Sequence, residues 1–220
     1  MAERKPRIMV AIPTMQTVPI EFMECMLNLE GNGDTSIRFE VSSLIYNARS
    51  HLMKKAMEIR ADYIMWFDSD MIFTSDTLRR LLSDCEQGMD IVSGLYFMRG
   101  VPTKPVLAKE IDWDISEKGI KHNVEYYLDY PKNQIFEIAG CGFGCVMTKV
   151  QTIYEVANSY GMSPFDPLPG LGEDYSFCWR MRNRGIKIYC DSSVKCGHLG
   201  TRMYDEKLYE EQKNEKTGNS

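Results

Sequence analysis

Short apolar or β-branched runs alternate with amphipathic stretches through the first half of the chain. Between the runs, apolar residues recur at helical spacing, at Leu44, Ala48, Leu52 and Ala56, and again at Leu78, Leu81, Leu82 and Cys85 after a start signal at Ser75. This alternation predicts an α/β protein with a largely parallel central sheet flanked by helices. The predicted strands of this half are residues 8–12, 38–42, 63–67 and 91–93.

The second half of the chain differs in composition and in its pattern of apolar residues. Residues 101–130 contain two prolines, mixed charges and an aromatic pair, which predicts loops and short antiparallel strands covering one side of the ligand site. Strands are predicted at 135–139 and 187–190, and helices at 149–159 and 175–183. We find no internal repeat and no long linker. The sequence therefore predicts one domain over residues 1–205, followed by a polar tail at 206–220 that frays.

Composition narrows the class of protein but not its chemistry. With 220 residues, 44% hydrophobic and 26% charged, the chain can bury one large core. A net charge of −5 disfavours a broad nucleic-acid surface, although a local basic groove stays open. Seven cysteines, an odd number in a chain of this size, favour reduced thiols. No apolar run approaches the roughly 20 residues that span a bilayer, and the start of the chain lacks the apolar centre of a signal peptide, so we expect a cytoplasmic protein without a membrane span.

Two carboxylates follow the third predicted strand. Asp68 and Asp70 lie two residues apart where the apolar run ends. Ligands of open α/β sheets bind outside the carboxyl ends of the strands, and paired carboxylates can hold a divalent cation together with the phosphates it carries. The alternative is structural: Asp68 and Ser69 end the strand, and Ser75 or Asp76 caps the next helix.

The order of the motifs resembles that of the GT-A fold glycosyltransferases that use nucleotide sugars, in particular family 2-like members. Asn47-Ala48-Arg49 precedes the strand that ends in the Asp-x-Asp motif, Asp68-Ser69-Asp70. The first strand is closed by Pro13-Thr14, and a glycine-rich segment occupies residues 140–144. Gly172-Glu173-Asp174 and finally His198 follow in the family order. The resemblance implies a GT-A, Rossmann-like sheet, mostly parallel, with a small antiparallel portion.

The resemblance also implies roles for individual residues. Asp68, Asp70 and His198 would bind Mn²⁺ or Mg²⁺, and Asp174 would be the base that deprotonates the acceptor, supported by Glu173. The nucleotide would lie against Pro13, Thr14, Arg49, Asp68 and Ser69, and the sugar against Tyr96, Arg99 and Gly142. Structural alternatives stay open: a surface Arg49, a packed His198, and two acids that only favour a helix start.

The activity that follows by resemblance is metal-dependent transfer of a sugar from a nucleoside-diphosphate sugar, a UDP-sugar, to an acceptor hydroxyl with inversion. Retaining members share the metal site but not the base. The acceptor is open between a glycan, a protein, a lipid-linked sugar and a modified nucleobase. Two alternative functions are a sugar nucleotidyltransferase, which would need a glycine-rich basic loop where residues 13–17 offer none, and a carbohydrate-binding protein without turnover.

Overall fold

The computed structural model describes residues 4–117 and 119–218, and its centre is a seven-stranded sheet. Five strands run in one direction, while β10 and β8 run in the opposite one. The mostly parallel α/β architecture predicted from the sequence is therefore confirmed. In spatial order the strands are β2 (Thr35–Val41), β1 (Ile8–Thr14), β3 (Tyr63–Phe67), β10 (Cys145–Lys149), β5 (Ile91–Leu95), β11 (Ile188–Lys195) and β8 (Ile135–Ile138).

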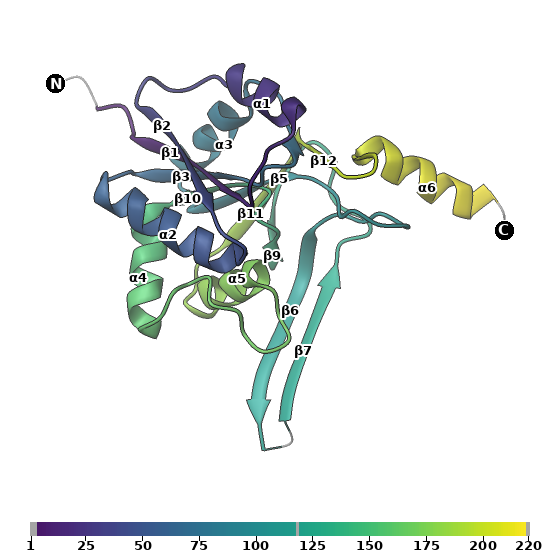
Figure 1. Ribbon diagram of the computed structural model, residues 1–220. Helices are drawn as coiled ribbons and strands as arrows, with labels where there is room; N and C mark the ends of the chain where they lie inside the picture. The colour runs from purple at the N-terminus through teal and green to yellow at the C-terminus, as the bar shows by residue number, and fades with distance from the viewer. Residues whose placement is uncertain (1–3, 118, 219–220) are drawn as a thin grey trace.

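Helices cover both faces of this sheet (Figure 1). Helices α1 (Ile20–Leu27) and α3 (Thr77–Glu86) cover one face, and α2 (Ile45–Glu58), α4 (Val150–Tyr160) and α5 (Glu173–Asn183) cover the other. Alternate residues of each buried strand supply the two cores: Met9 packs in the core with α2, α4 and α5, and Val10 in the core with α1 and α3. Burial on both faces explains why these strands are continuous apolar runs.

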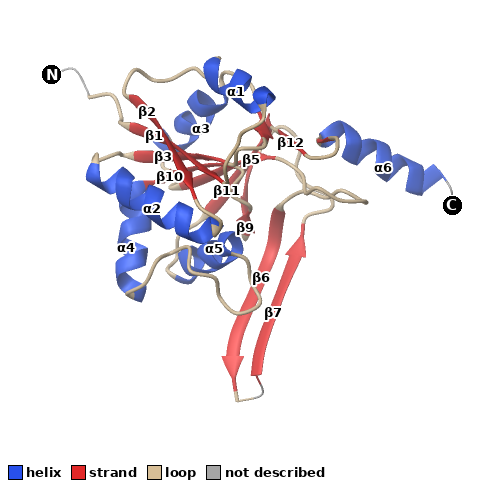
Figure 2. Cartoon of the chain, viewed as in Figure 1, coloured by secondary structure: helices blue, strands red, loops and turns tan. Residues whose placement is uncertain are grey.

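Two small antiparallel sheets adjoin the central one. The first joins β4 (Met71–Ile72), β12 (Gly197–Leu199) and β13 (Met203–Tyr204). The second joins β6 (Leu107–Ser116), β7 (Gly119–Tyr126) and β9 (Gly140–Cys141). Strands β6 and β7 form a long hairpin, here called the arm, that projects from the body of the molecule (Figure 2). Loops and short strands were predicted here. A long hairpin forms instead because apolar and polar residues alternate in the same way along β6 and β7, which pair as far as Ser116 and Gly119.

The end of the chain also differs from the prediction. Residues 206–218 form α6, where a frayed tail is expected from the sequence. The helix is attached through Tyr209, whose ring stacks on Phe97 with centroids 5.2 Å apart, and through Glu206, which pairs with Lys195 at 2.5 Å. Tertiary contacts thus order a segment whose composition alone would not stabilise a helix.

Two further features bear on the protein's class. All seven cysteines are free thiols, six of them buried. Among the helices of the described residues, none has both the length and the apolar character required to cross a membrane.

Candidate active site

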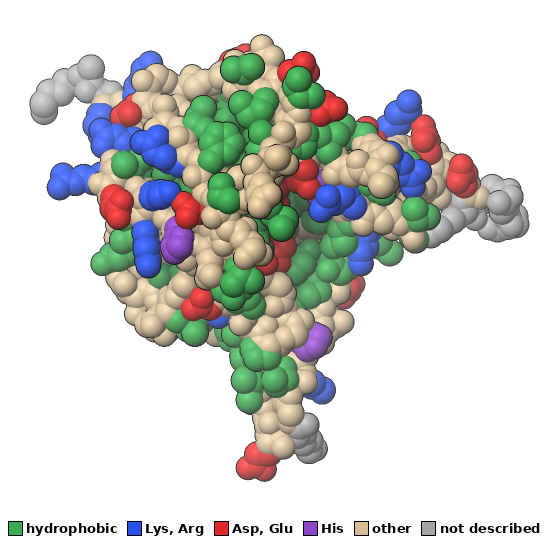
Figure 3. Space-filling view, viewed as in Figure 1, with side chains coloured by type: hydrophobic (Ala, Val, Ile, Leu, Met, Phe, Trp, Pro, Cys, Tyr) green, Lys and Arg blue, Asp and Glu red, His purple; other side chains and the backbone are tan. Residues whose placement is uncertain are grey.

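The predicted site residues gather at one edge of the central sheet, where β1 and β3 end. Ala11 lies beside Trp66 in the parallel β1–β3 pair, so Pro13 is level with Asp68 two residues farther along each strand. Thr14 lies at the same edge, and its hydroxyl donates to the Thr17 carbonyl at 3.3 Å. The space-filling view shows acidic side chains inside a hollow at the centre of this face, bordered by apolar groups (Figure 3).

Arg49 contacts both acidic motifs, the one that contains Asp68 and the one that contains Glu173. Its Nη2 donates to Asp68 Oδ1 at 2.9 Å, and its Nε donates to Glu173 Oε1 at 3.4 Å. The arginine is only 2% exposed, and its guanidinium lies 5.2 Å from the centre of the Phe143 ring. Although burial alone would lower the pKa of Arg49, the charges of Asp68 and Glu173 raise it. Arg49 is thus a permanent buried cation, and its remaining nitrogen, Nη1, has no partner among the described residues.

Asp70 and His198 meet because a short ladder joins their backbones. His198 of β12 pairs with Met71 of β4, and Leu199 N donates to Asp70 O at 2.8 Å. In the side chains, His198 Nε2 lies 3.4 Å from Asp70 Oδ2, and His198 Nδ1 lies 3.0 Å from the Phe97 carbonyl. Burial would raise the pKa of Asp70, but the hydrogen bond and charge of His198, with the charge of Arg99, lower it.

These side chains fit a divalent cation. A carbonyl next to Nδ1 keeps the proton on that nitrogen, so Nε2, which faces Asp70, is the nitrogen that would give up its proton and bind a cation, as in many metal-binding histidines. One carboxylate and one imidazole are ligands that suit Mn²⁺. Within residues 4–117 and 119–218, no three His, Cys, Asp or Glu side chains are grouped closely enough to hold a metal. A cation here would therefore take its other ligands from phosphate oxygens and water.

Asp174 is the acid whose ionisation is most altered. It lies in the first turn of α5, and its Oδ1 accepts from Tyr175 N at 2.7 Å. Part of its surface stays accessible, yet the surrounding protein atoms, and then the charge of Glu173, raise the pKa of Asp174 to about 7. A carboxylate with a pKa near neutrality can accept a proton at physiological pH and release it again, which is what a general base requires.

The glycines of the 140–144 segment make room for Tyr96. A methyl group on Gly142 would lie 2.2 Å from the Tyr96 hydroxyl and 3.5 Å from Asp174 Oδ2. Gly144 N donates to the Tyr96 hydroxyl at 2.9 Å, and Tyr96 is only 3% exposed. Gly142 thus allows a close approach between the backbone and Tyr96, while its contact with the sugar stays a prediction.

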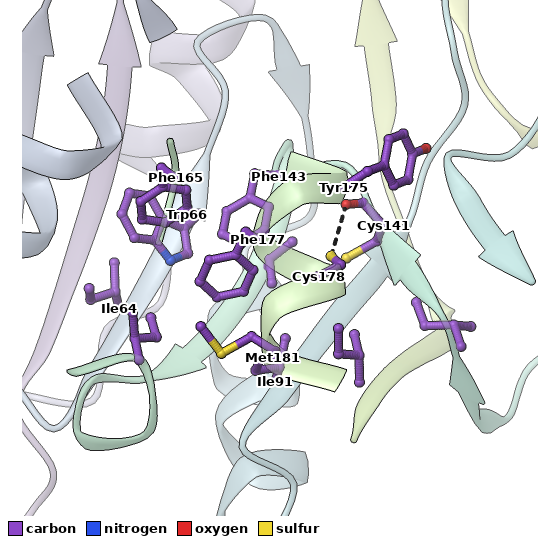
Figure 4. Close-up of a cluster of buried hydrophobic side chains, with 14 of the residues drawn as sticks. Ile64, Trp66, Ile91, Cys141, Phe143, Phe165, Tyr175, Phe177, Cys178 and Met181 are labelled. Atoms are coloured by element: carbon purple, nitrogen blue, oxygen red, sulfur yellow. Dashed lines mark hydrogen bonds between the residues drawn. The ribbon is translucent and has the colours of Figure 1, made fainter. Parts of the chain in front are cut away.

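A cluster of aromatic rings supports the site from beneath. Phe143, Phe165 and Phe177 contact one another, with ring centroids between 4.8 and 5.4 Å apart, and Trp66 packs against the first two (Figure 4). Trp66 is on β3, just before Asp68, and Phe177 is on α5, just after Asp174. The cluster fixes the end of β3 relative to the start of α5, and therefore the spacing of the two acidic motifs.

The structure brings most of the predicted residues together. Asp68, Asp70, Arg49, Glu173 and His198 form the contacts described above, and Arg99 joins them through an ion pair with Asp70 at 3.1 Å. Ser69 lies in a turn that is closed by a hydrogen bond from Met71 N to Asp68 O at 3.2 Å. Sequence reasoning missed the Arg49–Glu173 link, the Phe97 carbonyl behind His198 and the Gly144–Tyr96 bond. Each of these contacts joins residues far apart in the chain, so no short sequence pattern could have predicted them.

Comparison with solved structures shows a shared fold. No protein-family model matches the sequence, and no curated protein matches it. One similar solved structure is described as A197 from STIV, with a TM-score of 0.60 and 17% identity over 88% of this chain and 86% of that one. Another is described as GalNAc-T7 with UDP, GalNAc and Mn²⁺, with a TM-score of 0.61 and 13% identity over 95% of this chain and 48% of that one. This chain thus spans about half the length of the second structure. At these identities the likeness shows the GT-A type of fold and nothing finer.

Proposed function

We propose that this protein is a metal-dependent glycosyltransferase that moves a sugar from a UDP-sugar to an acceptor hydroxyl with inversion. One observation carries the proposal: Asp70 and His198, a pair suited to a cation, share one edge of the sheet with Asp174, a carboxylate with a pKa of about 7. Arg49 connects the two motifs through Asp68 and Glu173. The fold shared with a structure that contains UDP, GalNAc and Mn²⁺ supports the choice of donor and metal.

The donor would bind beside Asp68 and Asp70. A divalent cation at Asp70 and His198 would neutralise charge that develops on the diphosphate as it leaves. Arg99, which is half exposed and pairs with Asp70, supplies a second positive charge on the same side. Pro13 and Thr14 at the end of β1 would contact the nucleoside, while buried Arg49 would hold Asp68 in place from beneath.

Asp174 would act on the acceptor. Its Oδ1 is occupied by Tyr175 N, so the other oxygen, Oδ2, is the one that would take the hydroxyl proton. As that proton moves, the acceptor oxygen forms its bond to the anomeric carbon, and the bond from that carbon to the diphosphate breaks with inversion. Glu173 is a weaker candidate for the base because its Oε1 faces the Arg49 guanidinium. We assign Glu173 the role of positioning the start of α5 through its contact with Arg49.

Metal dependence provides the test. Release of UDP from a panel of UDP-sugars should require Mn²⁺, should stop in excess chelator and should return when Mn²⁺ is restored. Asp70→Asn removes a cation ligand and should abolish both UDP release and the Mn²⁺-induced rise in melting temperature. Asp114→Asn, at an exposed position on the arm, is the matched control and should behave as wild type. Full activity in excess chelator would refute the proposal.

A further inference from the structure

The arm has one apolar and one charged face. Because side chains alternate along a strand, the β6–β7 register places odd residues of β6 and even residues of β7 on the same side. The charged face has Glu110, Asp112, Asp114, Lys121 and Glu125. The apolar face has Ile111, Trp113, Ile115, Ile120, His122, Val124 and Tyr126. The hairpin is therefore amphipathic, the pattern of an antiparallel sheet with one packed face and one solvated face.

Only the inner half of that face is covered by the protein itself. Trp113 Nε1 donates to the Pro169 carbonyl at 3.1 Å, and the Trp113 ring packs against Trp179 with centroids 5.1 Å apart. At the tip, Ile115 is 59% exposed and Ile120 is 48% exposed. Ile115 and Ile120 are paired near the end of the arm, and the arm projects from the body of the molecule (Figure 1). Exposed apolar groups on a projecting element are typical of a contact surface.

The edge of β7 is open as well. Within the described residues, β7 pairs with β6 only, and all the residues of β7 are at least partly exposed. An open edge presents unpaired N–H and C=O groups that can pair with another strand. β6 also has an open edge beyond Ala108, since β9 pairs only with Leu107 and Ala108. The charges decide which of the two edges can pair with its own copy.

Self-pairing of β6 would be repulsive. In an antiparallel pair centred on Asp112, Glu110 of one copy would face Asp114 of the other. For β7, pairing centred on Asn123 places Lys121 opposite Glu125 twice and Ile120 opposite Tyr126 twice. When the two-fold axis passes through a residue, even-numbered residues of one β7 lie opposite even-numbered residues of the other, so both apolar faces are on the same side of the joint sheet. An axis between two residues would place the two apolar faces on opposite sides.

We infer that the protein forms a two-fold symmetric dimer in which the β7 strands of two copies pair antiparallel about Asn123. The two arms then make one four-stranded sheet with a continuous apolar face. The interface is isologous, so each favourable contact occurs twice. Glu125 already pairs with Lys109 of its own arm at 2.7 Å, and Lys121 of the second copy adds a second cation beside it.

This arrangement brings the arm of one copy to the active-site side of the other. Ile120 of the second copy would lie beside Tyr126, whose ring contacts Tyr175 edge to face with centroids 5.9 Å apart. Tyr175 follows Asp174 directly. In the dimer, Ile120 near the tip of each arm is therefore paired with Tyr126 of the other copy, next to the candidate active site. The inference does not depend on the proposed reaction.

Light scattering and site-specific cross-linking test this dimer. The wild-type protein at high micromolar concentration should have the mass of a dimer. Asn123→Cys places two thiols on the two-fold axis, with Cα atoms about 4.5 to 5.5 Å apart, which a disulfide can bridge. Diamide, which accepts the two hydrogens, should then convert most of this variant to a covalent dimer on a non-reducing gel.

Lys121→Cys is the register control. Two copies of residue 121 would be about 14 Å apart along the strand direction, too far for a disulfide. This variant should cross-link no more than the wild type, whose seven thiols set the background. A wild-type monomer at high concentration overturns the inference. So does equal cross-linking at positions 121 and 123, or a wild-type dimer in which Asn123→Cys does not cross-link.

Discussion

Two neighbouring acids at the start of α5 differ in what surrounds them. Glu173 faces the Arg49 guanidinium, a cation that cannot lose its proton at ordinary pH. Asp174 has a backbone N–H on one oxygen and is surrounded by protein atoms, so its pKa rises to about 7. Adjacent carboxylates held in different environments can take different roles in one active site.

The pH dependence of transfer follows from this pKa. A base must be ionised, and Asp174 loses its charge as pH falls through about 7. Transfer at saturating donor should therefore fall about tenfold per pH unit below that value. Asp174→Asn should remove this dependence and slow transfer by about 100-fold or more, while UDP and Mn²⁺ still bind in calorimetry. A wild-type profile in the Asn variant would exclude Asp174 as the base.

Gly142 should not tolerate a methyl group. Gly142→Ala would place its Cβ 2.2 Å from the Tyr96 hydroxyl, so backbone or ring must move. Overpacking of this kind costs about 1 to 3 kcal/mol of the free energy of unfolding. Chemical denaturation should show that loss, and it should be smaller when the substitution is made in Tyr96→Phe, which lacks the hydroxyl. Equal losses in both backgrounds would mean that the hydroxyl is not the obstacle.

Contacts between elements create a second perturbed acid, far in sequence from the site. Asp84 of α3 is 6% exposed and lies near Asp191 of β11. Burial, and then the charge of Asp191, raise its pKa to about 6 despite the opposing charge of Arg80. Its Oδ2 has no partner among the described residues. The folded protein therefore holds the Asp84 proton more tightly than the unfolded chain does.

The pH dependence of stability tests whether Asp84 of α3 has this raised pKa beside Asp191 of β11. A raised folded-state pKa gives stability that is complete below the unfolded value of 3.8 and lost as pH rises through about 6. Asp84→Asn should therefore raise the melting temperature above pH 6 and change it little near pH 4. Asp76→Asn, at the start of the same helix, should instead lower the melting temperature at neutral pH, and this loss should shrink only as pH falls below 3.8, because the Thr74 hydrogen bond lowers the pKa of Asp76. Parallel changes in both variants would contradict the assignment.

The elements that could be predicted from sequence are those with a local signal. The strand before Asp68 and the helix that contains Arg49 both follow from apolar periodicity. The two-residue strand β4 and its partner β12 have no such signal, yet they bring His198 to Asp70. His198 was placed near the metal by resemblance to a family, and the physical reason is a ladder that only the folded chain reveals.

At the scale of the whole molecule, the last helix supports the site from a distance. Tyr209 of α6 stacks on Phe97, and the carbonyl of Phe97 lies next to His198 Nδ1. Tyr130 packs near both rings. The polar composition of residues 206–220 gave no sign of this role, because two aromatic contacts and the ion pairs of Glu206 order the helix.

Removal of the Tyr209 ring should therefore affect both stability and metal binding. Tyr209→Ala leaves a cavity against Phe97 and should cost about 3 kcal/mol of the free energy of unfolding, while Tyr209→Phe, which keeps the ring, should cost about 1 kcal/mol. Calorimetry should show weaker Mn²⁺ binding in the Ala variant than in the Phe variant. Unchanged stability in Tyr209→Ala would show that α6 does not contribute to the fold.

The position of β10 has a consequence for how the chain is made. β10 lies between β3 and β5, although it follows both of them in sequence. When the ribosome has synthesised the first hundred residues, β3 and β5 are both complete but have no strand to join them. The nascent chain then exposes two apolar strand edges until Lys149 has emerged, a state that favours aggregation. Synthesis of this protein should therefore depend on chaperones that bind extended apolar segments, and pausing of the ribosome before residue 145 should lower its yield.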